Sequence, residues 1–339
     1  MRCWLLVAVL LGLGLASCAA PGVDRPRVQP VGAGPAATPS DTQPLQRVVI
    51  GVPGPSLSYL PAQLAWRLGY FREEGLDAEF VQISGTSVIP ALLSGELDFT
   101  TILSAVGAHA GQGGPSRILQ FHTVRLQHVL SVRPEITTIA QLAGRRVAVQ
   151  SLGTLTAFET QKLAEHFGLA DVALVAVGGD LERIAAMEAG AADATVAPIP
   201  ANLIAERRGF PTLLRIGTVL EIPQAGLGAS VATLREREAL VARTLRAAAR
   251  ALPLIPSQRD TVVQHIAEWI DLAPEDAARA YEQVVDTYSP NGLPTEAQLA
   301  AYLELLRATA GVPADVTPVQ LVDFTVARRV AAELGLPGP

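Results

Sequence analysis

The sequence predicts an α/β protein with two similar lobes, followed by a mostly helical C-terminal part. Strand-like apolar runs alternate with helix-like segments, a pattern typical of mainly parallel sheets. The order repeats after about 95 residues: Gly95 and Gly190 each end a helix, and Asp98 and Asp193 each follow three residues later. From Thr233 onwards the apolar spacing is helical.

The first lobe is expected to be built from β-α-β units whose loops carry small hydroxyl residues. Gly69 and Gly95 are C-terminal stop signals, and Ser84–Ser87 supplies a loop with a helix cap. The expected strands are Val48–Val52, Asp77–Ile83, Leu97–Ile102, Ile118–Phe121 and His128–Val132, and the first helix is Pro61–Leu68.

The second lobe is expected to repeat this order, and a return strand at Gln224–Val231 leads to the C-terminal helices. Its expected strands are Arg145–Val149, Val172–Val177, Ala192–Val196 and Phe210–Ile216, and its helices are Thr156–Phe167, Leu181–Ala189 and Ala201–Arg208. The C-terminal helices are expected at Arg235–Leu252, Ser257–Ile270, Pro274–Val285, Glu296–Ala308 and Val319–Leu334.

The N-terminus predicts export and attachment of lipid. Arg2 precedes the apolar run Trp4–Leu15, which is short for a membrane span. The run ends in Leu15-Ala16-Ser17-Cys18, which resembles a bacterial lipobox, where cleavage leaves Cys18 as the lipid-bearing first residue. The only other cysteine, Cys3, is removed with the leader, so no disulfide partner remains. An ordinary signal peptide with an incidental cysteine is the alternative.

The segment after the leader predicts a tether. Residues 19–46 are rich in Pro, Gly, Ala and Thr and cannot bury enough apolar surface to become ordered. No later segment has the length and uniform apolarity of a transmembrane helix. We therefore expect residues 1–18 to be a lipoprotein signal peptide, and the folded part to lie in the periplasm or at the cell surface, anchored to a membrane by lipid.

Composition and motifs exclude several classes of function. A net charge of −6 argues against a nucleic-acid partner. The sequence has no Gly-x-Ser-x-Gly elbow, His-Glu-x-x-His motif or phosphate loop, so no catalytic residue is expected. Asp98 and Asp193 lie at matched strand starts, which favours a structural role over catalysis. No metal or cofactor is expected, because the histidines are dispersed: His109, His122, His128, His166 and His265.

The loops that follow the strands remain as candidates for ligand binding. In parallel sheets, ligands bind outside the carboxyl ends of the strands, and helix N-termini there attract anions. None of these loops contains Arg or Lys, so an anion would rely on backbone N–H and hydroxyl groups, and a neutral polar ligand fits equally well. The loops are Gly54–Tyr59, Ser84–Ser87, Leu103–Ala105, Gln150–Thr156 and Ala197–Pro200. Ordinary helix capping is the alternative for each hydroxyl.

A family resemblance covers about Val48 to Leu252. It is carried by the segments Pro61–Ala65, Gly69–Phe71, Glu74–Leu76, Ala91–Asp98 and Leu142–Val149. With these segments, the chain resembles bacterial ABC-transporter substrate-binding proteins of the nitrate, sulfonate and taurine type, which include pyrimidine-binding relatives of thiamine-precursor uptake. The resemblance implies a type II periplasmic-binding fold, with residues 47–132 and 227–339 in lobe 1 and residues 133–226 in lobe 2.

The resemblance also implies which residues contact a ligand between the lobes. Contacts are expected from Ser58 and Tyr59, from Gly85–Ser87 and from Ser151–Thr154. The first loop lacks the Trp and the Asn-His pair of pyrimidine-binding members, which argues against a thiamine precursor. With the other loop residues, the candidate set is Ser56, Ser58, Tyr59, Ser84, Gly85, Thr86, Ser87, Ser104, Ser151, Gly153, Thr154 and Pro198.

We therefore expect a monomeric, lipid-anchored solute receptor that closes on a small organic solute, sulfonate-like or otherwise polar or aromatic. Its partners would be an ABC permease and its ATPase. Two alternatives stay open: an enzyme on the same fold, of the pyrimidine or menaquinone-pathway type, and a ligand-sensing subunit of a signalling system.

Overall fold

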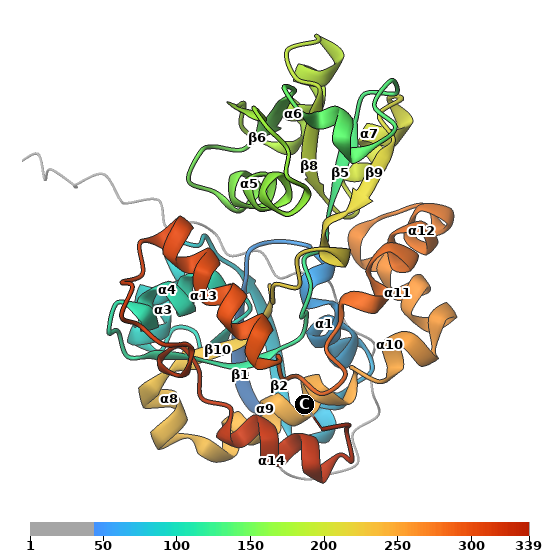
Figure 1. Ribbon diagram of the computed structural model, residues 1–339. Helices are drawn as coiled ribbons and strands as arrows, with labels where there is room; N and C mark the ends of the chain where they lie inside the picture. Colours follow the sequence, from blue (N-terminus) through green and yellow to red (C-terminus); the bar gives the residue numbers. More distant parts are fainter. Residues whose placement is uncertain (1–43, 339) are drawn as a thin grey trace, which may run out of the picture.

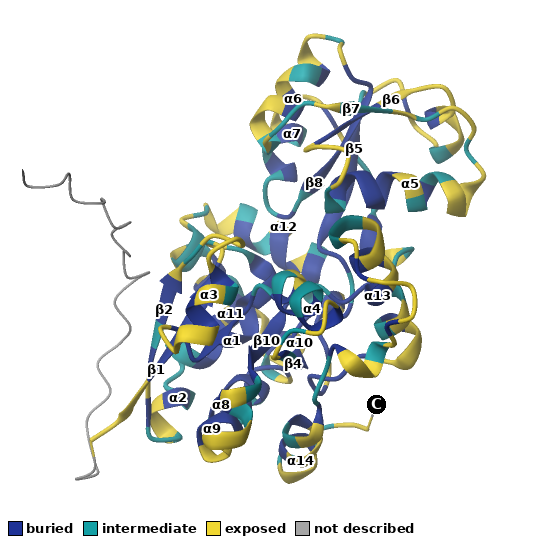
Figure 2. Ribbon diagram, turned by 90° about the vertical axis from the view of Figure 1, so that its left-hand side faces the viewer, coloured by how far each residue is buried: buried dark blue, intermediate teal, exposed yellow. Residues whose placement is uncertain are grey.

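Two five-stranded sheets, one in each lobe, organise the computed structural model of the chain, which describes residues 44–338 (Figure 1). The predicted leader, Cys18 and most of the predicted tether lie outside the described residues. Within residues 44–338, no helix has both the length and the apolarity needed to cross a membrane. Figure 2 shows that the central strands of both sheets are mostly buried, whereas exposed residues lie mainly on helices and loops.

The first sheet has the strand order β2-β1-β3-β10-β4. β1 pairs in parallel with β2 and β3, and β10 runs antiparallel between β3 and β4, so the predicted mainly parallel sheet is confirmed. The strands are β1 Gln46–Val52, β2 Leu76–Gln82, β3 Phe99–Thr100, β4 Ser116–Phe121 and β10 Gly226–Ser230. The associated helices are η1 Leu57–Tyr59, α1 Leu60–Arg67, α2 Tyr70–Glu73, α3 Val88–Ser94 and α4 Leu103–Gly111.

The second sheet has the strand order β7-β6-β8-β5-β9. The predicted division at residue 132 placed His128–Val132 in lobe 1, whereas this strand, β5, pairs with β8 and β9 in the second sheet. The chain crosses between the lobes one strand earlier than expected, at residues 122–127. The strands are β5 His128–Val132, β6 Arg146–Val149, β7 Ala173–Ala176, β8 Ala194–Pro198 and β9 Thr212–Arg215. The helices are η2 Ile139–Leu142, α5 Leu155–Phe167, α6 Asp180–Glu188, α7 Asn202–Arg207 and η3 Ile216–Thr218.

Two segments, residues 122–127 and 219–225, connect the lobes and are hydrogen-bonded to each other. The Ala225 amide donates to Thr123 Oγ1 at 2.9 Å, and the His122 amide donates to the Ala225 carbonyl at 2.7 Å. The second segment enters β10 at Gly226, where a Cβ atom would lie 1.9 Å from the Gln120 carbonyl oxygen. Only glycine fits this close approach of two strands.

The C-terminal helices pack around lobe 1 and extend to lobe 2. They are α8 Val231–Glu236, α9 Glu238–Arg250, α10 Leu254–Ser257, α11 Arg259–Ile270, α12 Pro274–Val284, η4 Val285–Thr287, α13 Glu296–Ala310, η5 Pro318–Gln320 and α14 Thr325–Glu333. The predicted helix Arg235–Leu252 is split, because Arg237 leaves helical geometry with φ −132°. The last helix begins later than predicted, because Thr317 and Gln320 form a capping box around η5.

The repeated aspartates have the predicted structural role. In lobe 1, Asp98 Oδ2 accepts a hydrogen bond from the Val49 amide of β1 at 2.8 Å. In lobe 2, Asp193 Oδ2 accepts one from the Arg146 amide of β6 at 2.9 Å. Each carboxylate also pairs with an arginine: Asp98 with Arg237, and Asp193 with Arg146. The same contact thus ties the start of one strand to its neighbour in both lobes.

Candidate functional site

The carboxyl ends of the parallel strands in one lobe point toward the other lobe. The chain leaves the first sheet at the end of β4 and enters the second at the start of β5. β4 runs in the same direction as β1, β2 and β3, because each of β4 and β3 is antiparallel to β10. In the second sheet, β6, β7 and β8 run opposite to β5. The predicted loops therefore gather at two facing edges, where α/β proteins bind ligands.

The loop after β1 places two serines at the edge of lobe 1. The Ser58 amide donates to Ser56 Oγ at 3.3 Å, and the two Oγ atoms lie 2.9 Å apart. Ser56 is half-buried and Ser58 is buried. The Ser56 hydroxyl therefore caps η1, and Ser58, within η1, is hydrogen-bonded to it.

Tyr59 has an internal role instead of the predicted ligand contact. Its side chain is 1% exposed, its hydroxyl donates to the Gly54 carbonyl, and its ring meets that of Trp269 edge-on at 5.3 Å. Burial raises the pKa of the Tyr59 hydroxyl. The sequence could not indicate this, because Trp269 comes from α11, far along the chain.

The loop after β2 presents exposed hydroxyls at the edge of lobe 1. Ser84, Gly85, Thr86 and Ser87 are all exposed. Ser84 Oγ lies 3.1 Å from Thr86 Oγ1 and 2.9 Å from Ser87 Oγ, and it accepts a hydrogen bond from the Ser87 amide at 3.3 Å. The three hydroxyls thus form one cluster with spare donors and acceptors.

Two other predicted residues lie at the edges in different settings. Ser104 is exposed, but it lies in the first turn of α4, since the helix Leu103–Gly111 already begins where the loop Leu103–Ala105 was expected. Pro198 is the last residue of β8 and is paired with His128 of β5. Its half-buried ring lies at the edge of lobe 2 nearest the crossing segments.

The loop after β6 supplies the corresponding edge of lobe 2. Ser151 and Gly153 are exposed and Thr154 is half-buried. Thr154 Oγ1 donates to the Ser151 carbonyl at 2.7 Å and lies 3.1 Å from Thr156 Oγ1, which accepts from the Gln150 amide at 3.0 Å. This network fixes the loop at the N-terminus of α5.

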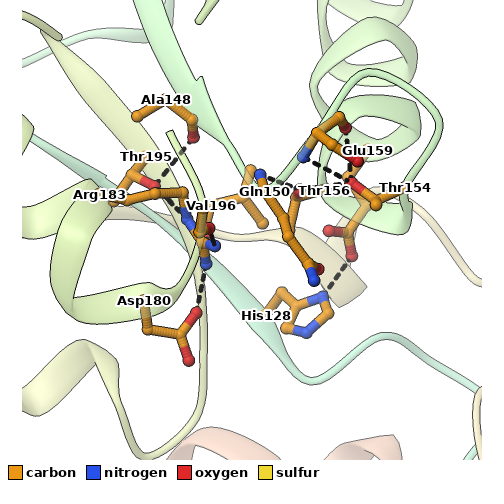
Figure 3. Close-up of polar contacts among 12 residues, drawn as sticks. His128, Ala148, Gln150, Thr154, Thr156, Glu159, Asp180, Arg183, Thr195 and Val196 are labelled. Atoms are coloured by element: carbon orange, nitrogen blue, oxygen red, sulfur yellow. Dashed lines mark hydrogen bonds and ion pairs between the residues drawn. The ribbon is translucent and has the colours of Figure 1, made fainter. Parts of the chain in front are cut away.

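A buried ion pair at the edge of lobe 2 was not predicted from the sequence (Figure 3). His128 Nδ1 lies 2.6 Å from Glu159 Oε1, which comes from α5 and is fully buried. Burial alone would lower the pKa of His128, but the Glu159 carboxylate outweighs burial and raises it. No spacing signal connects residues 128 and 159, because their contact depends on β5 joining the second sheet.

A second ion pair lies on the other side of the exposed Gln150 side chain (Figure 3). Arg183 of α6 is 2% exposed and pairs with Asp180. Its guanidinium also donates to Thr195 Oγ1 at 3.1 Å and to the Gly178 and Val196 carbonyls at 2.7 and 3.1 Å. Arg183 therefore holds the ends of β7 and β8 together and has few donors left for a ligand.

Direct contacts between the lobes lie on both sides of the crossing segments. On one side, Lys162 of α5 lies 2.5 Å from Glu304 of α13. On the other, Arg207 of α7 lies 2.8 Å from Asp276 of α12, and Asn202 donates to Gln283 at 3.0 Å. These contacts are polar, which suits surfaces that separate and meet again.

The side chains at the two edges are suited to binding by hydroxyl, amide and backbone groups. In the described part of the chain, no three side chains of His, Cys, Asp or Glu come together in a way that could hold a metal ion.

Known structures share this architecture. A periplasmic sulfonate-binding protein, SsuA from Methylobacillus flagellatus KT, superimposes with a TM-score of 0.71 at 16% identity, covering 88% of this chain and 97% of that one. The nitrate-binding protein NrtA from Synechocystis PCC 6803 gives 0.66 at 14% identity, covering 86% and 90%. The alkanesulfonate-binding protein SsuA from Xanthomonas axonopodis pv. citri, bound to MOPS, gives 0.63 at 18% identity, covering 84% and 100%.

No match was found among curated proteins. The family model described as NMT1/THI5 like matches residues 58–258, more than half of the 339 residues. This match includes β2 to β10, the whole second lobe and most of the loops at both facing edges. The chain therefore belongs to the NMT1/THI5-like family.

Proposed function

We propose that this protein is the solute receptor of an ABC importer and captures a small organic solute between its two lobes. The solute would be sulfonate-like or another small polar or aromatic compound. The liganded form would dock on a membrane permease driven by an ATPase. The family match and the shared fold of sulfonate-binding and nitrate-binding proteins support this proposal.

One observation carries it: hydroxyl-rich loops lie at the facing carboxyl edges of both sheets. The cluster of Ser84, Thr86 and Ser87 belongs to lobe 1, and the network of Ser151 and Thr154 belongs to lobe 2. A ligand held by both would bind the closed arrangement more tightly than the open one. Closure then follows from that difference in affinity, with the crossing segments as hinges.

A panel of solutes tests the proposal. Thermal shift and calorimetry of the purified protein would use alkanesulfonates, nitrate, aromatic acids and pyrimidines. We expect at least one class to raise the melting temperature and to bind with measurable heat, because ligand that binds only the folded state stabilises it. Failure of every class to bind would refute a receptor role.

Substitutions then test the place of binding. The double variant Thr86→Ala/Ser87→Ala should weaken binding and leave folding largely intact, since both side chains are exposed. Thr261→Ala is the matched control: Thr261 is also exposed, lies on α11 and makes no side-chain hydrogen bond within residues 44–338. Equal binding by the double variant and the control would place the ligand elsewhere.

The proposed location is the periplasm or the cell surface, with a lipid on Cys18 holding the protein at a membrane. The lipobox-like residues before Cys18 support this, as does the absence of another cysteine after it. Cys18→Ser should release the protein from the membrane fraction and abolish labelling with radioactive palmitate. A variant that stays membrane-bound would contradict the anchor.

A further inference from the structure

We propose that His128, held by Glu159, is a ligand-contacting residue whose Nε2–H donates a hydrogen bond to an acidic group of the solute, such as a sulfonate or carboxylate. This inference rests on the proposed receptor function. It assigns a charged contact to a site where the loops themselves contain no Arg or Lys.

The position of His128 brings it to the edge where the loops gather. It is the first residue of β5 and pairs with Pro198, the last residue of β8. Since β5 runs opposite to β6, β7 and β8, its first residue lies at their carboxyl end. His128 therefore belongs to the same edge as the loops after β6 and β8, on the side of lobe 2 that faces lobe 1.

The contacts of the imidazole leave one nitrogen available. Nδ1 is bound to Glu159 Oε1 at 2.6 Å, a short, charge-assisted distance. Nε2 has no hydrogen-bond partner within residues 44–338, and it is not fully buried, unlike several other unpaired side-chain atoms there. The 10% of the side chain that stays exposed is thus consistent with an accessible Nε2.

Glu159 has features that a purely structural residue would not need. It is fully buried, and its second oxygen, Oε2, has no partner within residues 44–338. Replacing a buried ion pair with apolar side chains often stabilises a protein, so the pair is a poor stabilising device. It does, however, fix the ring orientation and favour the protonated imidazole, as a second partner does for many functional histidines.

The other charges around His128 are already engaged. In α6, Arg183 is paired with Asp180, and in β9, Arg215 is paired with Asp286 of η4. The Arg125 side chain, on the crossing segment, is paired with Glu221 at 2.7 Å. Each of these arginines is thus paired with a carboxylate of its own, whereas Nε2 of His128 has no partner within residues 44–338.

The charge of His128 gives a pH dependence with a defined sign. Its pKa is raised by Glu159, so the imidazolium persists to a higher pH than in a free histidine. Binding of an anion should be strongest below that pKa and should weaken as pH rises through it. A neutral analogue should show no such dependence, because it gains nothing from the positive charge.

The experiment compares matched probes across pH. Ethanesulfonate and benzenesulfonate do not titrate between pH 5.5 and 8.5, and ethyl methyl sulfone and methyl phenyl sulfone are their uncharged counterparts. Calorimetry with the unmodified protein should show affinity for a sulfonate that falls with rising pH. His128→Gln should weaken binding about ten- to hundredfold, the range for a hydrogen bond to a charged group.

Two further variants separate binding from folding. His128→Gln/Glu159→Gln removes both charges together, so a buried carboxylate is not left unpaired, and it should bind as weakly as the single variant. Glu159→Gln should move the pH profile of sulfonate binding to lower pH, because Glu159 acts through His128. His166→Gln, an exposed histidine on the same helix α5, is the control that should bind normally.

The outcomes distinguish this inference from the proposed function. If a sulfonate binds but its affinity ignores both pH and the His128 variants, the inference is wrong and the receptor role stands. Binding of only the sulfones, or of other neutral solutes, would likewise refute the inference and leave the receptor role standing. Failure of every solute to bind overturns both.

Discussion

The contact between Lys162 and Glu304 is predicted to bias the arrangement of the two lobes. Lys162 lies on α5 of lobe 2, 2.5 Å from Glu304 on α13 and 2.9 Å from Glu165 on its own helix. Its ammonium also lies 5.6 Å from the centre of the Phe158 ring. Lys162→Met keeps the apolar stem and removes the charge, so it cuts the cross-lobe attraction with little loss of packing.

The size of the effect follows from exposure. The Glu304 side chain is 54% exposed and that of Lys162 is 25% exposed, so solvent screens the pair. Exposed pairs of this kind contribute about 0.2–1 kcal/mol. The equilibrium constant between the observed arrangement and a more open one should therefore change by about 1.4- to fivefold.

Distance measurements between the lobes would detect this change. Glu96 in lobe 1 and Ala170 in lobe 2 are both exposed and can be replaced by labelled cysteines. Cys3 and Cys18 would first be replaced by serine, which leaves no other cysteine in the sequence. Pulsed electron spin resonance would then give the distribution of distances between the labels for each variant.

The matched control is Glu165→Gln, which removes the partner of Lys162 on the same helix but leaves the cross-lobe pair. It should leave the distribution unchanged, whereas Lys162→Met and Glu304→Gln should shift it alike, and the double variant no further. Identical distributions for the unmodified protein and Lys162→Met would refute the reasoning. So would an equal shift in the Glu165→Gln control.

Three further predictions concern stability. Asp193→Ala should lower the free energy of unfolding by about 1–3 kcal/mol in urea titrations, because the Arg146 amide loses its acceptor; an unchanged midpoint would contradict this. Gly226→Ala should cost about 1–3 kcal/mol or more, since the added Cβ meets the Gln120 carbonyl; a melting temperature equal to that of the unmodified protein would oppose it. Burial lowers the pKa of His265 to about 4, so folding loses stability as pH falls from about 6.5 toward 4. His265→Phe should remove that loss, and an acid transition that persists would exclude His265 as its source.

The internal repeat made much of the fold predictable from sequence. Gly95 and Gly190 both have positive φ values, 79° and 71°, as helix stops require. Asp98 and Asp193 make the same backbone contact in each lobe. These features are local in sequence or repeat at a fixed spacing, so one chain is enough to reveal them. The alternation of strands and helices similarly predicted two mainly parallel sheets.

The details of the candidate site depended on contacts between distant segments. Tyr59 is drawn inward by Trp269 of α11, and His128 is paired with Glu159 of α5. Neither partner can be identified from spacing, because each pair forms only when separate elements pack together. The assignment of β5 to lobe 1 was inaccurate for the same reason: an apolar strand such as β5 fits either sheet, and the point of crossing decides between them.

The features that repeat between the lobes, and those that do not, distinguish a structural edge of each sheet from a ligand-binding edge. The aspartate contacts lie at strand starts, since Asp98 and Asp193 directly precede β3 and β8. The facing edges differ between the lobes: both carry hydroxyl-rich loops, but lobe 2 adds His128 with a buried carboxylate, and lobe 1 has no matching pair at Ser84–Ser87. If both edges served stability alone, the repeat would be expected to extend to both. Its restriction to the edges that face away from the other lobe is consistent with an inner pair of edges shaped by one asymmetric ligand, polar along one side and acidic at one end.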